Sequence, residues 1–416
     1  TVFYWVGGSG NWNDAGHWSF TSGGAPNNVC IPDATDDVVF NAASFNAPGQ
    51  TVSITSEAFC KSMNWTGVTN NPQLNSGGFG VNLNLFGSLT FSAGMSLSGG
   101  SYIVFHGAAA GNTITTNGIA LSTVTFTGAG EYTFNDAATI SSLYFERGTL
   151  RTNNRSLALG SFNSWTNQSR HLYLGSSIIT ATTWHVSDSA GMVVYPGTSA
   201  IYMNGNSFYG GGLSYNRVYL RTRDNFLYGG NTIDSLFIKA GSMVEVQAGK
   251  TTTINYLSAT GKCDSMIYIF SSSTTANTVF SKSSGTITVN YIRLKNTTVQ
   301  GGATFNALNA VDNGGNVGWN ITPVGNRTFY WVGGTGNWSQ TSHWSFASSG
   351  ASAGCLPAES DDVIFDNNSG SGSYTVTISS DAFCRTMDWS SAAGTPTITG
   401  IGTLTICGSM ILRNSL

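Results

Sequence analysis

The segment NRVYLRTRDNF holds the densest group of side chains that could do chemistry in this 416-residue sequence. In an extended strand, Arg217, Tyr219, Arg221 and Arg223 would all project from one face. Arg supplies planar hydrogen-bond donors, and Tyr supplies an apolar ring with a polar tip. One interpretation is a contact strip for a neutral or acidic sugar. The other, which the sequence favours, is a solvated strand face whose Arg side chains lie beside core Tyr residues.

The acidic residues do not form the pattern of a polysaccharide-cleaving enzyme. Such a site needs two converging carboxyl groups, about 5 to 10 Å apart for glycoside hydrolysis, or an Arg or Lys base in a cleft. The acids in the middle of this chain are scattered, and no two of them alternate within one expected strand. We therefore expect no enzymatic activity and no cofactor.

Two pairs of adjacent aspartates could bind calcium with the help of nearby carbonyl groups. They are Asp36 with Asp37 and Asp361 with Asp362. Aspartates in front of a strand more often cap the turn that leads into it. The sequence therefore predicts no metal site, with calcium at these four residues as the weaker alternative.

A tryptophan-rich module occurs twice and contains both pairs of aspartates. Phe3–Phe20 and Phe329–Phe346 are identical at 13 of 18 positions, and the similarity continues as far as Trp65 and Trp389. Apolar residues alternate in TVSIT and TVTIS, which predicts a small all-β unit. Its tryptophans are expected to form its core or its contact with the next element. They are Trp5, Trp12, Trp18 and Trp65 in the first copy and Trp331, Trp338, Trp344 and Trp389 in the second.

The histidines show no spacing typical of a metal site. His17 and His343 occupy the same position of the two modules, each directly before a tryptophan. A repeated histidine beside a repeated aromatic residue favours a structural, hydrogen-bonded role over a role as metal ligand.

The cysteines repeat with the module. Cys30 and Cys60 lie 30 residues apart in the first copy, and Cys355 and Cys384 lie 29 apart in the second. Two matched pairs predict two matched disulfides and hence an exported protein. The alternative is four buried thiols. Cys263 and Cys407 have no counterpart in the other copy and are expected to be free and buried.

The middle of the chain consists of short strand-like segments separated by Gly, Asn, Ser and Thr, such as GSLTFS, STVTFTG and SLFIKAG. No stretch has the apolar spacing of a helix, which predicts an all-β fold. Strands of three to five residues at such close intervals favour a parallel β-solenoid of about 20 to 25 residues per turn. We expect an entry module at 1–66, a solenoid at 67–320, a linker at 321–326, and a second entry module with the start of the next solenoid at 327–416.

Composition excludes several classes of partner. Only 9% of the residues are charged, against about 25% in a typical soluble domain, and the net charge is −3. Such a chain has no broad positive field, so nucleic acid is not an expected partner. It also has no run of 18 apolar residues, so no membrane insertion is expected.

The stretch YIRLKNTTVQGGATFNALNAVDNGGNVGWN resembles the closing segment of bacterial right-handed parallel β-helices of the pectin-lyase-like type. The resemblance implies that the solenoid is right-handed and ends here. The residues that carry it are Gly301, Gly302, Ala303, Thr304, Phe305, Asp312, Asn313, Gly314, Gly315, Gly318 and Trp319.

The opening FYWVGGSGNWNDAGHWS, with PDATDDVVF and CKSMNW, looks like the repeat units of giant cell-surface proteins of Bacteroidetes, which include gliding-motility adhesins exported by the type IX system. The resemblance implies a tandem repeat of an extracellular filament that provides reach, stiffness and surface contact. The expected partners are surface glycans or polysaccharide, or other copies of the same filament. It also implies O-glycosylation within three Asp-Ser-apolar triplets, at Ser189, Ser235 and Ser265.

Two other functions stay open from the sequence. One is a secreted, carbohydrate-binding β-helix protein that uses the Arg and Tyr strip. The other, less favoured, is a polysaccharide lyase or hydrolase, which would need carboxylates that converge in one groove.

Overall fold

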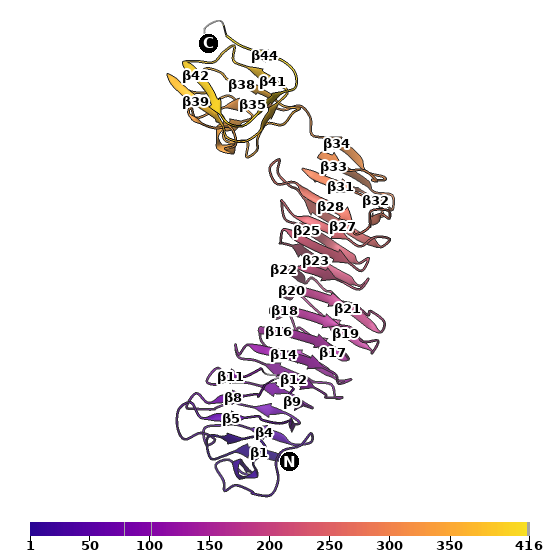
Figure 1. Cartoon of the computed structure of the whole chain (residues 1–416). Helices are drawn as coiled ribbons and strands as arrows, with labels where there is room; N and C mark the ends of the chain where they lie inside the picture. The colour runs from indigo at the N-terminus through magenta and orange to yellow at the C-terminus, as the bar shows by residue number, and fades with distance from the viewer. Residues whose placement is uncertain (79, 101, 414–416) are drawn as a thin grey trace.

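The structure, a computed structural model, describes residues 1–78, 80–100 and 102–413. The last three residues of the expected second module, 414–416, lie outside the described residues. Within these ranges the regular structure is almost entirely strand, with two short 3-10 helices, η1 (Ala15–His17) and η2 (Thr341–His343). The strands stack into a parallel β-solenoid of about 17 turns, which confirms the all-β solenoid expected from the sequence (Figure 1). No helix within the described ranges is long and apolar enough to cross a bilayer.

One side of the solenoid is a ten-stranded sheet that starts in the first module. Its neighbours run parallel except for the antiparallel pair β1–β3. Its strands are β1 (Val2–Trp5), β3 (Trp18–Ser19), β4 (Asp37–Val39), β7 (Met63–Asn64), β10 (Leu89–Thr90), β13 (Asn112–Thr115), β15 (Glu131–Phe134), β17 (Gly148–Arg151), β19 (Arg170–Tyr173) and β21 (Met192–Tyr195).

A short second sheet supports the first turns. Its strands are β2 (Gly10–Asn11), β5 (Thr51–Ser53), β8 (Gln73–Asn75) and β11 (Ser96–Ser98).

The third set of parallel strands runs the length of the rod. It contains β6 (Ala58–Cys60), β9 (Asn82–Leu85), β12 (Tyr102–Phe105), β14 (Leu121–Phe126), β16 (Ala138–Phe145), β18 (Leu157–Ser164), β20 (Ile178–Val186), β22 (Ala200–Tyr209), β23 (Ser214–Leu220), β24 (Asp224–Tyr228), β25 (Thr232–Ile238), β26 (Met243–Val246), β27 (Thr251–Ala259), β28 (Ile267–Ser271), β29 (Thr278–Ser281), β30 (Thr286–Asn290), β31 (Ile292–Lys295), β32 (Thr297–Gln300), β33 (Thr304–Asp312) and β34 (Asn320–Pro323).

Parallel pairing in register places like side chains above one another in the core. Val124 pairs with Leu143 and Leu143 with Phe162, each 19 residues further along the chain. Phe162 pairs in turn with Trp184, and their rings stack with centroids 4.1 Å apart. Because side chains alternate between the two faces of a strand, the other residues of each strand face outward and carry the polar surface.

The expected boundary at residue 66 is not a break in the structure. The ten-stranded sheet passes from β7 of the first module directly to β10 and β13. One buried core likewise extends from Phe3 to Ala310. The first module therefore forms the opening turns of the solenoid, and it covers their end with aromatic side chains.

The tryptophans form the core of both modules, as predicted. Trp5, Trp12, Trp18 and Trp65 are completely buried. His17 stacks on Trp5 with ring centroids 4.9 Å apart, and its Nδ1 is 2.9 Å from the carbonyl oxygen of Val6. His343 makes the same contacts with Trp331 and Val332 in the second copy. The predicted structural role of these two histidines is confirmed.

The repeated SGNW and TGNW motifs also have a steric reason. A Cβ atom on Gly10 would lie 2.1 Å from Nε2 of His17, and one on Gly336 would lie 2.1 Å from Nε2 of His343. Only glycine leaves room for the histidine ring at this position.

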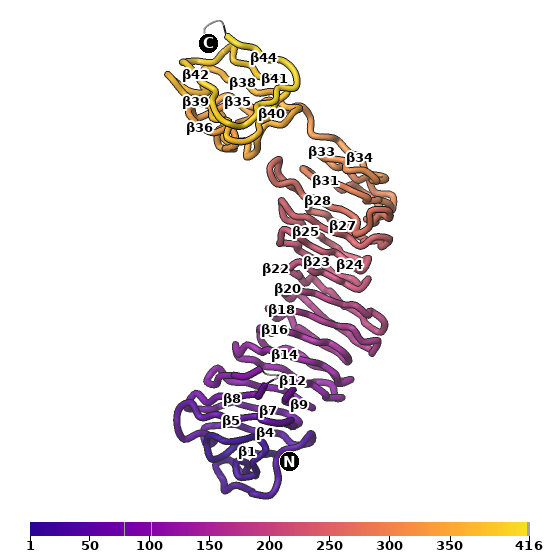
Figure 2. The backbone as a smooth tube through the Cα atoms, viewed as in Figure 1, coloured from indigo at the N-terminus to yellow at the C-terminus, as the bar shows by residue number. Residues whose placement is uncertain are grey.

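The solenoid closes later than residue 320. In β34, Ile321 pairs with Ala307 and Pro323 with Ala310, so half of the expected linker belongs to the last turn. Trp319 of the closing segment packs edge-to-face on Phe305. The rest of the expected linker, residues 324–326, forms no β-strand, and Figure 2 shows it as a single segment of chain that leads to the second module.

The second module repeats the architecture of the first. Its strands are β35 (Thr328–Trp331), β36 (Gly336–Asn337), β37 (Trp344–Ser345), β38 (Asp362–Ile364), β39 (Ser373–Ile378), β40 (Ala382–Cys384), β41 (Thr386–Asp388), β42 (Thr395–Gly400), β43 (Leu404–Ile406) and β44 (Met410–Ile411). Trp331 pairs with Trp344 as Trp5 pairs with Trp18. Met387 pairs with Met410 as Met63 pairs with Leu89, so the parallel strand pairing of the first module recurs in the second.

The predicted disulfides are wrong. Cys355 is bonded to Cys263, which lies 92 residues earlier in the solenoid. Cys30, Cys60, Cys384 and Cys407 are free thiols. Cys60 and Cys384 face the core on β6 and β40, whereas Cys30 lies in the loop between β3 and β4 and Cys355 in the equivalent loop between β37 and β38. The equal spacing reflects duplication of the whole module and not pairing within it.

The two cysteines without a counterpart are also placed differently from the expectation. Cys263 is in the disulfide, and Cys407 is exposed. Cys263 belongs to a small hairpin, Lys262–Ser265, that contacts the core of the second module. The disulfide therefore links the solenoid to the module that follows it.

We expect loss of this disulfide to increase the rate at which proteases cleave the connection at residues 324–326. Gly325 and Asn326 are already exposed, and the disulfide is the covalent restraint that keeps the flanking units together. In Cys355→Ser, cleavage there should accelerate by at least about tenfold, because local opening costs less free energy. Limited proteolysis with mass spectrometry would measure this. Cys407→Ser is the control, and equal rates in both variants would contradict the prediction.

Candidate functional site

A column of aromatic side chains runs along the outside of the rod. Tyr202 on β22 pairs with Tyr219 on β23, and Tyr219 pairs with Phe237 on β25. The ring centroids are 4.3 Å and 4.2 Å apart, close to the spacing of neighbouring strands. Tyr256 on β27 continues the column at 5.6 Å from Phe237. We call Tyr202, Tyr219, Phe237 and Tyr256 the tyrosine column.

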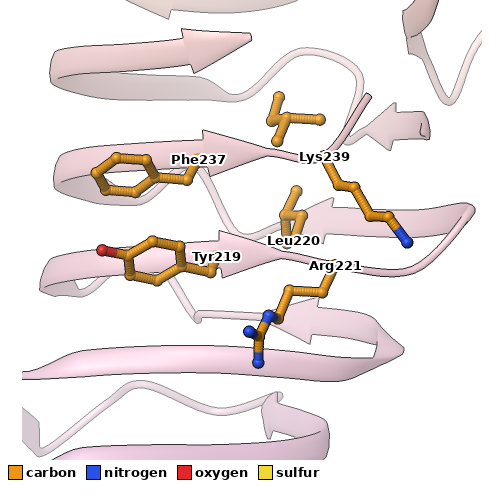
Figure 3. A pocket seen from close by; sticks show the side chains of 6 residues that line it. Tyr219, Leu220, Arg221, Phe237 and Lys239 are labelled. Atoms are coloured by element: carbon orange, nitrogen blue, oxygen red, sulfur yellow. The ribbon is translucent and has the colours of Figure 1, made fainter. Parts of the chain in front are cut away.

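Basic side chains lie beside this column. The guanidinium of Arg221 lies over the ring of Tyr202, 4.7 Å from its centroid. Arg217 donates a hydrogen bond of 2.7 Å to the carbonyl oxygen of Thr198, which fixes it next to the column. Figure 3 shows the rings of Tyr219 and Phe237 on successive strands, with Arg221 and Lys239 beyond the ends of those strands. The strip predicted from Arg217, Tyr219 and Arg221 is therefore assembled on one surface.

Arg223 does not belong to this surface, so the predicted four-residue strip is wrong at one end. The strand β23 ends at Leu220, and the chain turns before β24 begins at Asp224. Arg223 instead lines a separate hollow of about 640 Å³, together with Cys263 and Ser265. The prediction assumed that one extended strand continues to Arg223, but side chains stop alternating between two faces where the strand ends.

The hollow beside the tyrosine column has a volume of about 410 Å³. Its lining consists of Tyr219, Leu220, Arg221, Phe237, Ile238 and Lys239. Burial raises the pKa of Tyr219, the neighbouring Tyr202 raises it further, and Arg217 opposes the rise. The Tyr219 hydroxyl therefore stays neutral near neutral pH and can donate a hydrogen bond. The surface offers flat apolar rings, neutral hydroxyls and cationic donors, which suits a sugar ring with neutral or acidic groups.

A second, similar column was not predicted from the sequence. Tyr173 on β19 stacks on Tyr195 on β21 with centroids 4.1 Å apart. The guanidinium of Arg151 on β17 lies 3.9 Å from the centroid of Tyr173 and forms an ion pair of 2.9 Å with Glu131. These residues lie on the ten-stranded sheet and not on the strands of the tyrosine column. Their numbers, 151, 173 and 195, differ by 22, which is one turn of the solenoid.

The paired aspartates are engaged by protein groups. Asp361 is completely buried and accepts two hydrogen bonds from the Arg327 guanidinium. Asp362 is bound by Arg385 and by the hydroxyl of Thr386.

In the first copy, Asp36 accepts from the Thr1 amino group at 2.9 Å and from the backbone N–H of Asp33. Asp37 is a half-buried residue of β4. In the part of the chain that the structure describes, no three His, Cys, Asp or Glu side chains are grouped as metal ligands.

Several other acids in the solenoid each bind a local partner. Asp136 accepts from the backbone of Thr116 and Asn117, and Asp312 accepts from the backbone of Gly314. Glu245 accepts from the hydroxyl of Tyr228. These bonds hold turns and neighbouring strands together.

The three candidate glycosylation serines lie at partly accessible positions. Ser189 lines a hollow between neighbouring turns, and Ser265 belongs to the hairpin of Cys263. Ser235 lies on β25 in register with Arg217, and its hydroxyl donates to Asp234.

Comparison with known proteins adds no relative. No protein family model matches the chain, and no curated protein or solved structure matches it either.

Proposed function

We propose that this chain is a structural and adhesive segment of a long extracellular surface filament. In this proposal the solenoid supplies length and stiffness, and each tryptophan module ends one rod and begins the next. The resemblance to Bacteroidetes surface proteins supports a role like that of gliding-type adhesins exported by the type IX system. The disulfide supports an oxidising, extracellular location at the cell surface.

One observation carries the proposal. After the first solenoid closes at β34, the second module repeats the strand pairing of the first. A module that both follows one rod and begins the next is suited to tandem repetition. The disulfide between Cys263 and Cys355 then keeps consecutive rods together.

Imaging of the intact protein tests the tandem arrangement. Negative-stain images of cell-surface material should show filaments with an axial period of one rod plus one module. The mass of the full chain should equal several such units. Short particles without a period, together with a full chain that ends near residue 416, would contradict the filament.

We further propose that the filament contacts surface glycans or polysaccharide through the tyrosine column. Stacked rings present flat apolar faces to sugar rings, and Arg217 and Arg221 offer donors to hydroxyl or carboxylate groups. The same observation supports the second candidate function, a secreted carbohydrate-binding protein. We propose that neither role includes catalysis, because several carboxylates of the solenoid hold turns or strands in place.

We expect Tyr219→Ala with Arg221→Ala to weaken glycan binding by at least about tenfold. The double change removes the central ring of the column and the cation beside it, contacts typical of binding hot spots. A glycan array followed by titration calorimetry on any hit would measure the loss.

Tyr144→Ala with Arg155→Ala is the matched control, since both residues lie outside the column. Equal binding by both double variants would refute the proposed contact surface. An array without any hit would point to contact between copies of the filament, which sedimentation of the intact protein would then detect.

A further inference from the structure

Cys30 and Cys355 occupy the same loop of the two modules. The backbone N–H of Asn27 donates to the carbonyl of Trp18 at 2.7 Å, and that of Ala353 donates to Trp344 at 2.7 Å. At the other end, the carbonyl oxygens of Asp36 and Asp361 each accept a backbone bond of 2.6 Å. Between these anchors the first copy has one more residue before its cysteine.

The two cysteines differ in what covers them. Cys355 is only 2% exposed, because the Lys262–Ser265 hairpin of the preceding solenoid lies against it and supplies Cys263. Cys30 is a free thiol and is exposed. The equivalent residue in the same chain is thus already bonded to a partner.

The surroundings of Cys30 suit the same kind of cover. Val29 is 86% exposed and Ile31 is 37% exposed, whereas the counterpart of Ile31, Leu356, packs against the second core. The loop itself is ordered, because Asn27 Oδ1 accepts hydrogen bonds of 2.8 Å from the backbone N–H groups of Val29 and Cys30. Val29, Cys30 and Ile31 therefore form an ordered, solvent-exposed apolar surface with the thiol at its centre.

We propose that Cys30 forms a disulfide with Cys263 of a second copy of this solenoid that precedes it in head-to-tail order. The Lys262–Ser265 hairpin of that copy then covers Val29 and Ile31. The inference rests on the tandem arrangement proposed above and extends it from one joint to every joint.

The bond forms by thiol–disulfide exchange with a small-molecule disulfide such as oxidised glutathione. The Cys30 and Cys263 thiols lose two protons and two electrons. The small disulfide takes up both and leaves as two thiols, so the exchange is balanced.

A duplicated chain tests the proposal. Residues 1–326 are placed directly in front of the full 416-residue chain, so that Thr1 follows Asn326 and takes the place of Arg327. The protein is equilibrated with glutathione buffer, alkylated and mapped by mass spectrometry without reduction. We expect Cys30 of the full chain to be linked to Cys263 of the added copy. Its alkylation should fall at least about tenfold below that of the exposed Cys407, a free thiol in the same molecule.

The same molecule contains its own positive control, the Cys263–Cys355 bond of the full chain. If that bond forms while Cys30 stays open to alkylation, the proposal is overturned. If neither bond forms, the duplicated chain has misfolded, and a variant with a smaller change then tests the proposal. Residues 347–355 of the full chain are then replaced by residues 21–30, which puts the longer loop in front of the native hairpin.

The grafted cysteine is expected to bond Cys263. A free grafted thiol in a variant whose β35 and β41 amides keep their protection from hydrogen exchange would also overturn the proposal. Failure here is distinguishable from failure of the filament. Periodic filaments in which Cys30 is free would contradict only the proposed disulfide. Short particles without a period would contradict the proposed filament.

Discussion

Trp18→Ala is expected to lower the free energy of unfolding of the first turns by about 3–5 kcal/mol, the usual cost of truncating a fully buried aromatic residue. Trp18 makes edge-to-face contacts with Trp5 and Trp12 at 5.0 and 4.9 Å. Its indole N–H donates to the carbonyl oxygen of Trp12 at 2.7 Å. Alanine would leave a cavity at the end of the rod and an acceptor without its donor.

Hydrogen exchange under native conditions measures this loss at the amides of β1 and β4. Trp165→Ala is the matched control, because Trp165 is 49% exposed and its truncation should cost under about 1 kcal/mol. Trp344→Ala should weaken the second module and leave β1 unchanged, since the two modules have separate cores. Equal losses for Trp18 and Trp165 would contradict the role assigned to the aromatic end.

Arg170→Met is expected to lower the free energy of unfolding around β19 and β21 by about 3–5 kcal/mol, because it leaves several buried acceptors unpaired. Arg170 is completely buried. Its guanidinium donates to the carbonyl oxygens of Gln168, Asp188 and Ala190 at 3.0, 2.9 and 2.7 Å, and to the hydroxyl of Ser164. Methionine fills similar space but donates no hydrogen bond.

Urea unfolding and hydrogen exchange at β19 and β21 would measure the effect. Arg155→Met is the control, because Arg155 is exposed on a turn. Arg170 also holds the turn that presents Ser189, so proteolysis within residues 187–190 should increase in Arg170→Met alone. A variant as stable as the control would show that water replaces the guanidinium at these carbonyl groups.

The fold was predictable because it repeats simple local rules. Short strands, close turns and the absence of helical spacing are sufficient to indicate a stack of parallel strands. The buried tryptophans could also be predicted, because a residue type as large as Trp5 or Trp331 repeated in a module must be packed somewhere. Both conclusions depend on side-chain size and alternation, which are visible in the sequence.

The contacts between turns were harder to predict. Tyr202, Tyr219 and Phe237 are neighbours because their turns are 17 and 18 residues long, whereas side-chain alternation predicts only which residues of one strand share a face. The prediction of the disulfide pairing was wrong for a related reason. Cys263 and Cys355 meet because a hairpin leaves the rod and reaches the following module, and spacing within a module contains no trace of that contact.

The Cys263–Cys355 bond also determines how the chain would carry mechanical load. If the two ends are pulled apart, tension passes from Cys263 directly to Cys355 and bypasses the segment between them, which includes β28 to β34 and the whole connection. That segment spans a separation of 92 residues and would extend to roughly 300 Å if unravelled, at about 3.3 Å per residue. The oxidised chain is therefore nearly inextensible at this joint. A reducing agent would allow the segment between the two cysteines to unfold and extend under load, so the joint would become extensible and would dissipate mechanical energy.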